Sequence, residues 1–344
     1  MSKIILSLSC LVAVLALAYF KPFFWEPAPE PDNSFVLAKE SKYWSERLDM
    51  LGPEKSYREL KAKFSSRSYP KQHTAAHLFG VLLYEKFGVP SISTCDEMFG
   101  FGCFHGFFTK ALSVEGEKSV GKMDEECVKK FGLASQGCQH GIGHGIMEYR
   151  GRSNLAKALE DCKFTNQTRP IFGCTSGVFM EYNIPIILND EQAQDLSITE
   201  RLYNKNNPYH PCNEVKKEFL ESCYFEIPQY WKQVFRKDYK TTGELCEGIK
   251  SLYYKEICFL GLGHVLAPSL NHTMAEAFDG CQKMPNREAE ILCRAGSAWS
   301  FFANPQTRSD FRKLCEEGFK SEETALCIDK ADLAGNHGQT FESF

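Results

Sequence analysis

The sequence predicts an all-α protein: an α-solenoid of about eight helical hairpins, each about 35 residues long and stapled by disulfides. Three observations predict this fold. They are the spacing of the cysteines, apolar residues at helical spacing between them, and the lack of any sustained alternation of apolar and polar residues. The chain has 344 residues, of which 43% are hydrophobic and 24% charged, and it carries 15 cysteines. This composition excludes a mostly disordered or fibrous chain.

The first element along the chain is an apolar segment. Residues 4–20 are apolar or small, with a lysine on each side. We expect residues 1–21 to be either a cleaved signal peptide or an uncleaved membrane anchor, and we favour the anchor. Either segment would export the rest of the chain to the periplasm, a lumen or the extracellular space, and cleavage would leave it secreted. The proline-containing residues 22–56 predict a stiff spacer.

Fourteen cysteines follow Cys10 and form seven pairs along the sequence. The pairs are Cys95/Cys103, Cys127/Cys138, Cys162/Cys174, Cys212/Cys223, Cys246/Cys258, Cys281/Cys293 and Cys315/Cys327. Successive second members lie 34 to 36 residues apart, except for one interval of 49 residues, which indicates an insertion at about 183–209. A period in the thirties is the length of a helix–turn–helix unit. We therefore predict one repeat domain over 57–335, followed by a tail over 336–344.

Each period fits two helices. The second cysteine of a pair starts one helix, such as the one that ends near Tyr149, and Ser153 is placed to cap the next. Residues 154–162 carry apolar side chains at helical spacing, and residues 274–281 and 310–315 repeat that arrangement.

Two disulfide schemes fit this arrangement. Bridges across each loop consume all fourteen cysteines, whereas bridges within each hairpin, such as Cys103 to Cys127, leave Cys95 and Cys327 unpaired. Because free thiols are unfavourable in an exported protein, we favour the loop scheme.

A cysteine near the end of one helix and another at the start of the next, as in Cys95-x7-Cys103-Phe104, is typical of a known group. The chain resembles the cysteine-rich secreted members of the tetratricopeptide-like helical-hairpin repeats over about residues 58–333. The resemblance implies a solenoid, often used to bind a protein or peptide in its concave groove. It carries over no catalytic residue.

The histidines share the register of the cysteines. His105 and His140 each stand two residues after a cysteine. His140-x3-His144 matches His73-x3-His77 in a unit that has no cysteine. Histidines four residues apart project from one face of a helix, and packed helices lie about 8–10 Å apart. We expect these five histidines to supply three to five nitrogen ligands to one metal ion.

Imidazole ligands make zinc, iron or copper the candidate metals, and no other cofactor is indicated. Glu148 lies one turn beyond His144 and is the candidate catalytic base or an oxygen ligand. His264 recurs in the same register, and we interpret it as structural. Three histidines without a pattern are expected on the surface or in loops: His210, His272 and His337. The repeated glycines are expected to allow close helix contacts: Gly106, Gly141, Gly177, Gly261 and Gly296.

The net charge of −4, from 44 acidic and 40 basic residues, gives no indication of a nucleic-acid partner. The sequence also lacks Cys-x-x-Cys, His-Glu-x-x-His and Gly-x-Ser-x-Gly. We therefore predict an exported, membrane-anchored helical-repeat metalloprotein, with hydrolysis or oxidation as candidate reactions. The alternative is a non-catalytic scaffold outside the cytoplasm that binds a protein or peptide partner, with structural histidines.

Overall fold

A computed structural model describes residues 37–67, 69–132, 135–166, 171–183, 203–266, 273–303 and 308–335. Within these ranges every regular element is a helix and no β-strand occurs, so the predicted all-α class is confirmed. The chain divides after Tyr43 into two compact units, 1–43 and 44–344. The described part of the first unit, 37–43, is the start of one helix.

Two helices fall within or across the predicted spacer at 22–56. They are α2 (Leu37–Leu51) and α3 (Pro53–Phe64), so the spacer prediction extends too far toward the C-terminus. The physical reason is that residues after the proline-rich stretch carry apolar side chains on one face of a helix, and these side chains pack into the core. Trp44 and Leu48, four residues apart, are buried, and the Trp44 ring lies edge-on to Phe79 with ring centroids 6.2 Å apart.

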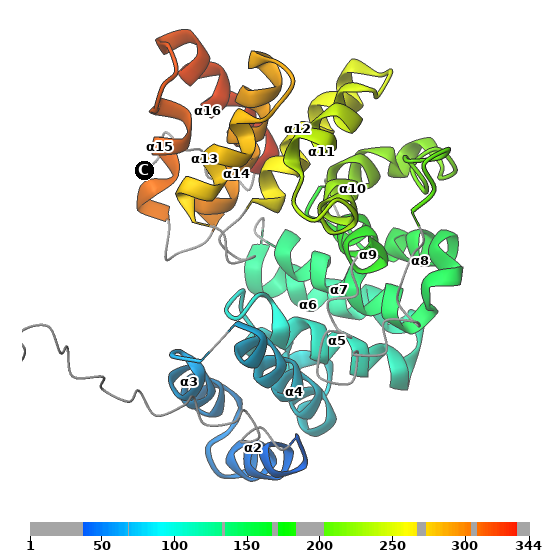
Figure 1. The fold of residues 1–344 in the computed structure, drawn as a ribbon. Coiled ribbons are helices and arrows are strands. Elements are labelled where there is room, and N and C mark those ends of the chain that lie inside the picture. The colour runs from blue at the N-terminus through cyan, green and yellow to red at the C-terminus, as the bar shows by residue number, and fades with distance from the viewer. Residues whose placement is uncertain are drawn as a thin grey trace, which may run out of the picture. The chain divides into compact units, whose positions relative to one another are not determined.

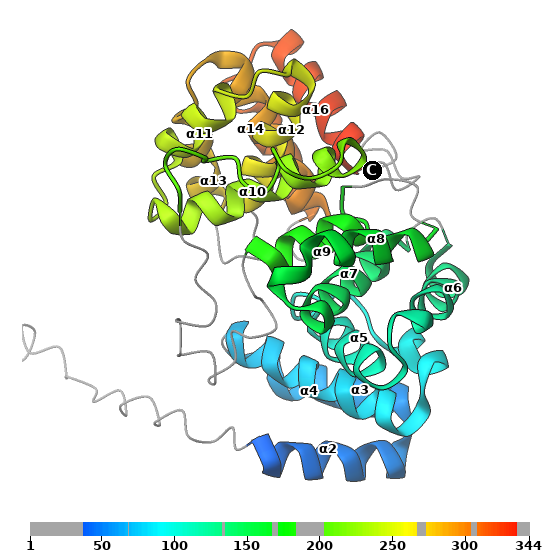
Figure 2. The same cartoon turned by 90° about the vertical axis from the view of Figure 1, so that its right-hand side faces the viewer.

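The longer helices of the second unit contact one another in chain order. They are α4 (Tyr69–Phe87), α5 (Gly102–Glu115), α7 (Gln136–Arg150), α9 (Cys174–Asn183), α10 (Leu220–Val234), α12 (Leu252–Val265), α14 (Arg287–Ala303) and α16 (Ser321–Gly335). Each of these helices packs against the next one, as can be followed for α4, α5, α7 and α9 in Figures 1 and 2. The predicted helical repeats are therefore present.

Shorter helices stand between the longer ones. They are α6 (Val120–Phe131), α8 (Leu155–Asp161), α11 (Tyr239–Glu247), α13 (Met274–Gln282) and α15 (Phe311–Glu316). Each packs on the longer helix that follows it. A short helix and the longer helix after it make up one period of about 35 residues, in agreement with the cysteine spacing.

Seven disulfides join the described cysteines, and they are the pairs of the loop scheme. They are Cys95–Cys103, Cys127–Cys138, Cys162–Cys174, Cys212–Cys223, Cys246–Cys258, Cys281–Cys293 and Cys315–Cys327. Their Cα atoms lie 5.5 to 5.7 Å apart, which is normal for a disulfide. Five of them fasten a short helix, or the turn directly after it, to the first two turns of the following longer helix.

Helix starts show where local sequence decides the structure and where it does not. Thr273 and Glu276 form a reciprocal capping box at the start of α13. The prediction that Ser153 caps the next helix is wrong. Residues Arg152–Asn154 form a 3-10 turn, and α8 begins after Asn154 without a side-chain cap. Asn154 instead donates to the Arg150 carbonyl oxygen over 2.7 Å, so it binds back to the preceding helix.

The disulfides are consistent with an oxidising or extracellular compartment. Among the helices in the described ranges, none combines the length and the apolar character needed to cross a membrane. The predicted export segment, residues 1–21, lies outside the described residues. The same is true of the tail at 336–344 and of most of the predicted insertion.

Candidate functional site

Four of the five histidines predicted as metal ligands have their rings in contact, and His77 interacts electrostatically with His73 and His105. His73 and His77 lie on α4, His105 on α5, and His140 and His144 on α7. Because α5 packs against both α4 and α7, the side chains from three helices meet in one place. We call these five residues the histidine cluster.

The rings of the cluster follow one another in an unbroken row. The ring centroids of His73 and His105 are 5.2 Å apart, and those of His105 and His144 are 4.4 Å apart. The row ends with His140, whose ring centroid lies 4.8 Å from that of His144. All four side chains are buried. Four imidazoles in contact inside a helical protein form a concentrated set of polar nitrogens that packing alone does not require.

At one end of the row, His73 is held by the backbone. Its Nδ1 donates to the carbonyl oxygen of Phe99 over 3.0 Å, since a carbonyl can only accept. Its Nε2 faces Nδ1 of His105 at 3.4 Å. If His73 is neutral, this Nε2 carries a lone pair that is directed into the cluster.

Next to His140 in the row, a carboxylate holds His144. Nδ1 of His144 lies 2.9 Å from Oε2 of Glu181, on α9, and both side chains are almost fully buried. The second ring nitrogen, Nε2, lies 3.0 Å from Nε2 of His140. Hydrogen-bonded to a carboxylate through one nitrogen, His144 directs the other toward its neighbour.

Burial keeps most of the cluster neutral. It is the main cause that lowers the pKa of both His77 and His144 to about 3, and the nearby His73 lowers them further. Burial, followed by the proximity of the His144 imidazole, lowers the pKa of His105 and of His140 well below the usual value. Neutral imidazole is the form that binds metals.

Two nitrogens of the cluster lack a hydrogen bond of normal geometry among the described residues. They are Nε2 of His77 and Nδ1 of His140, both buried. The backbone of Gly173 lies close enough to His140 to oppose the lowering of its pKa. An unsatisfied buried nitrogen costs about 1–3 kcal/mol, so these two atoms need an explanation.

Glu148 lies near the cluster, as its position one turn beyond His144 on α7 predicted. Its carboxyl group accepts a hydrogen bond from the hydroxyl of Thr109 on α5. Burial raises the pKa of Glu148 to about 7; the charge of Glu181 adds to this, and the Thr109 hydrogen bond opposes it. A carboxyl group that titrates near neutral pH can take up and release protons.

Glycines allow the histidine helices to approach one another closely. A methyl group on Gly106 would overlap the carbonyl oxygen of His77, and one on Gly177 would overlap the carbonyl oxygen of His140. Similar close approaches occur at Gly261 and Gly296, while Gly141 faces the side chain of Phe104. The expectation that the repeated glycines permit close helix contacts is therefore confirmed.

Glu181 is the residue of the site that sequence reasoning missed. Its unit carries Ser176 at the position of His105 and His140, so a search for repeated histidines passed over it. A positional signal was available. Glu181 follows Gly177 by four residues, which places both on the face of α9 that meets α7.

The other histidines lie outside the cluster. His264, on α12, pairs with the Ser300 hydroxyl over 2.7 Å and lies beside the rings of Phe172 and Phe225, which agrees with a structural role. His210 is partly exposed in a turn, as expected. His272 and His337 are outside the described residues.

Among the described side chains, no group of three or more His, Cys, Asp or Glu is arranged as a metal site as it stands. The cluster therefore consists of pairs of facing nitrogens and not of a finished coordination shell. Comparisons with protein-family models, with curated proteins and with solved structures find no match to this chain.

Proposed function

We propose that the protein is an exported helical-repeat metalloprotein whose histidine cluster holds a transition metal ion. The observation that carries this proposal is the way that His73 and His144 are held. His73 donates its Nδ1 hydrogen to the Phe99 carbonyl and His144 bonds through Nδ1 to Glu181. In a histidine that binds a metal, the ring nitrogen that does not face the metal characteristically donates its hydrogen to a carbonyl or a carboxylate.

The nitrogen separations also suit a metal. With metal–nitrogen bonds of about 2.05 Å, two ligands on one ion are about 2.9 Å apart in an octahedral site and about 3.3 Å apart in a tetrahedral one. The facing nitrogens are 3.0 Å apart in the His140–His144 pair and 3.4 Å apart in the His73–His105 pair. Either pair can thus supply two ligands, and a third requires rotation of a neighbouring ring. The rings of His105 and His144, one from each pair, are in contact, so either one can turn toward the other pair.

A bound metal ion would also explain why Nδ1 of His140 is buried without a hydrogen-bond partner among the described residues. If Nδ1 of His144 bears the hydrogen bonded to Glu181, its Nε2 has only a lone pair to offer. His140 must then donate from Nε2, which leaves its buried Nδ1 as an acceptor with nothing to accept. With a metal ion at the two Nε2 atoms, His140 carries its hydrogen on Nδ1, on the side of the Gly173 backbone.

Burial restricts the chemistry. His105 and His144 expose 2% and 1% of their surface, so a peptide or sugar chain cannot approach them directly. This favours a metal that exchanges electrons or handles a small molecule over one that hydrolyses a polymer. Zinc, iron and copper all accept imidazole ligands, and Glu148 is the proposed proton acceptor beside the cluster. Stacking of the successive helix pairs into a solenoid and anchoring through residues 4–20 belong to the same proposal.

Elemental analysis of untagged protein tests the proposal. We expect stoichiometric zinc, iron or copper in the wild-type protein and loss of the metal in the His140→Ala/His144→Ala variant. His210→Ala is the control, because it removes a histidine whose ring interacts with Glu214 and Tyr182 and not with the cluster. It should retain the metal.

Less than about a tenth of an equivalent of metal, equal in all three proteins, would refute the proposal. That result would favour the alternative of a scaffold for a protein or peptide partner, which the succession of helical repeats also suits. Circular dichroism and a count of free thiols would show whether each variant is folded.

A further inference from the structure

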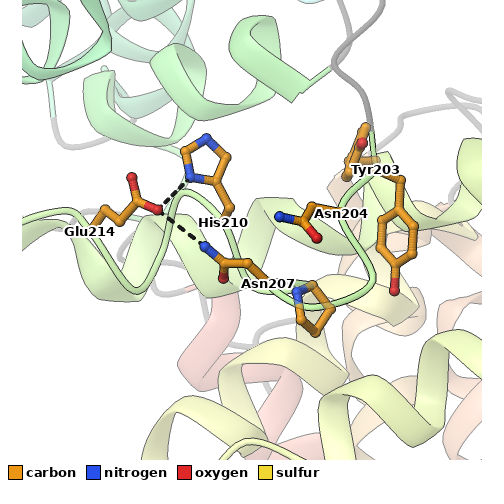
Figure 3. Close-up of a pocket in the computed structure, with 7 residues that line it drawn as sticks. Tyr203, Asn204, Asn207, His210 and Glu214 are labelled. Atoms are coloured by element: carbon orange, nitrogen blue, oxygen red, sulfur yellow. Dashed lines mark hydrogen bonds and ion pairs between the residues drawn. The ribbon is translucent and has the colours of Figure 1, made fainter.

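A small pocket is lined by residues that do not belong to the histidine cluster. Its volume is about 250 Å³, and it is formed mainly by the turns that lead into α10 (Figure 3). The lining residues are Tyr203, Asn204, Asn207, Pro208, His210, Glu214 and Tyr230. Pockets for drug-sized ligands measure about 300–1,000 Å³, so this one admits a ligand with a single ring.

A carboxylate in the wall of this pocket is held in place. Oε1 of Glu214 accepts from Nδ1 of His210 over 3.0 Å and from Nδ2 of Asn207 over 3.1 Å (Figure 3). Both donors are themselves supported. Nε2 of His210 lies 3.2 Å from the Tyr182 hydroxyl, and Oδ1 of Asn207 accepts from Asn213 over 2.6 Å. Glu214 is thus preorganised even though 55% of its side chain is exposed.

Two polar groups of the pocket are available to hydrogen-bond with a ligand. Within the described part of the chain, Oε2 of Glu214 has no hydrogen-bond partner, and neither has Nδ2 of Asn204. The amide oxygen of Asn204 accepts from the backbone of Asn206, which holds that side chain in position. The pocket therefore offers one fixed acceptor and one fixed donor to a ligand.

The remaining walls are apolar or aromatic. Tyr203 and Tyr230 supply phenol rings, and Pro208 supplies a flat saturated ring. Tyr203 packs edge-on against Phe235, with ring centroids 5.1 Å apart, so its ring is supported from behind. Rigid aromatic rings bind a ligand with little loss of side-chain entropy.

We propose that this pocket binds one sugar residue. A sugar hydroxyl donates to Oε2 of Glu214, a second accepts from Nδ2 of Asn204, and the C–H face of the ring packs on Tyr203. Hydroxyl groups both donate and accept, so a single ring satisfies both unused groups.

An organic cation fits this pocket less well than a neutral ring. The charge of Glu214 is partly engaged by His210, which lowers the pKa of the carboxyl group. In addition, the guanidinium of Arg152 interacts electrostatically with Tyr230 on the pocket wall. A positive ligand would be repelled by this nearby guanidinium, whereas a neutral polyhydroxyl ring would not.

Ligand-detected NMR tests the proposal on the full folded chain. The probes are glucose, galactose, mannose and N-acetylglucosamine, each at millimolar concentration, with choline as the cationic comparison. We expect saturation transfer to at least one sugar and none to choline. Glu214→Gln should weaken binding of that sugar about tenfold, because it removes a hydrogen bond to a charged group. Asn204→Ala should weaken it as well.

Glu218→Gln is the matched control, since Glu218 is another exposed glutamate in the same segment but pairs with Lys163 away from the pocket. It should bind the sugar as the wild-type protein does. Transfer to no sugar would overturn the proposal, and so would binding of choline in preference to sugars. Undiminished sugar binding by both folded pocket variants would overturn it too. The metal content of the histidine cluster does not enter into any of these outcomes.

Discussion

Gly177→Ala tests the close helix contact that builds the histidine cluster. The new methyl group would overlap the carbonyl oxygen of His140 and would also press on the backbone nitrogen of His144. Both are backbone atoms of α7, so a side chain cannot turn aside to make room. The two helices must separate.

The magnitude follows from three effects. Overpacking of a tight contact costs about 1–3 kcal/mol. Separation of α7 and α9 also stretches the buried hydrogen bond between His144 and Glu181, now 2.9 Å long, and losing it costs about 1.5–3 kcal/mol more. The better helix propensity of alanine returns about 1 kcal/mol. We therefore expect the variant to lose about 2–5 kcal/mol of unfolding free energy.

Denaturant unfolding under non-reducing conditions, followed by circular dichroism, measures the loss. The control is Gly121→Ala in α6, where a methyl group would lie 3.7 Å from its nearest neighbour, an ordinary contact. This control should be as stable as the wild-type protein or slightly more stable, because only the helix propensity changes. If Gly177→Ala unfolds at the same denaturant concentration as Gly121→Ala, the reasoning about the contact is wrong.

Two further predictions concern the rest of the repeat domain. Burial raises the pKa of Glu226 to about 8, so between about pH 5 and 8 the folded state holds a proton that the unfolded chain releases. Unfolding free energy should therefore fall as the pH rises through that window, and Glu226→Gln should flatten the slope; equal slopes in denaturant titrations of both proteins would contradict this. Cys315→Ala/Cys327→Ala removes a bridge with a sequence separation of 12, which is worth about 3 kcal/mol in the chain-entropy account. Hydrogen exchange should increase in α15 and α16 and stay unchanged in α5 and α7, whereas a uniform increase would contradict nearest-neighbour coupling of the repeats.

The repeat and its disulfides could be predicted because regular spacing requires no knowledge of tertiary structure. The cysteine period defined the register, and the register showed that His105 and His140 occupy one equivalent position and that His73 and His77 match His140 and His144. Residues at equivalent positions of adjacent repeats come together in any stacked arrangement, so the sequence was sufficient to bring the cluster together.

Features that occur once could not be predicted in this way. Glu181 stands one residue beyond the position that His144 occupies in its own unit, so no repeated histidine points to it, and the helix at Trp44 lies beside a proline-rich stretch. The sugar pocket depends on turns between Tyr203 and Glu214, where no period exists and the distances follow from the folded chain alone. Local propensity also misled at Ser153, because Asn154 binds the previous helix.

The short reach of the seven disulfides has a consequence for how the protein matures. Eight cysteines can pair in about 105 different ways, and by the same combinatorial rule fourteen cysteines can pair in about 10⁵ ways. Here every partner lies 8 to 12 residues away. A chain that enters an oxidising compartment from its N-terminus can therefore close each bridge before the next pair has emerged. The order of emergence selects the correct partners, so maturation depends little on an isomerase to rearrange wrong ones.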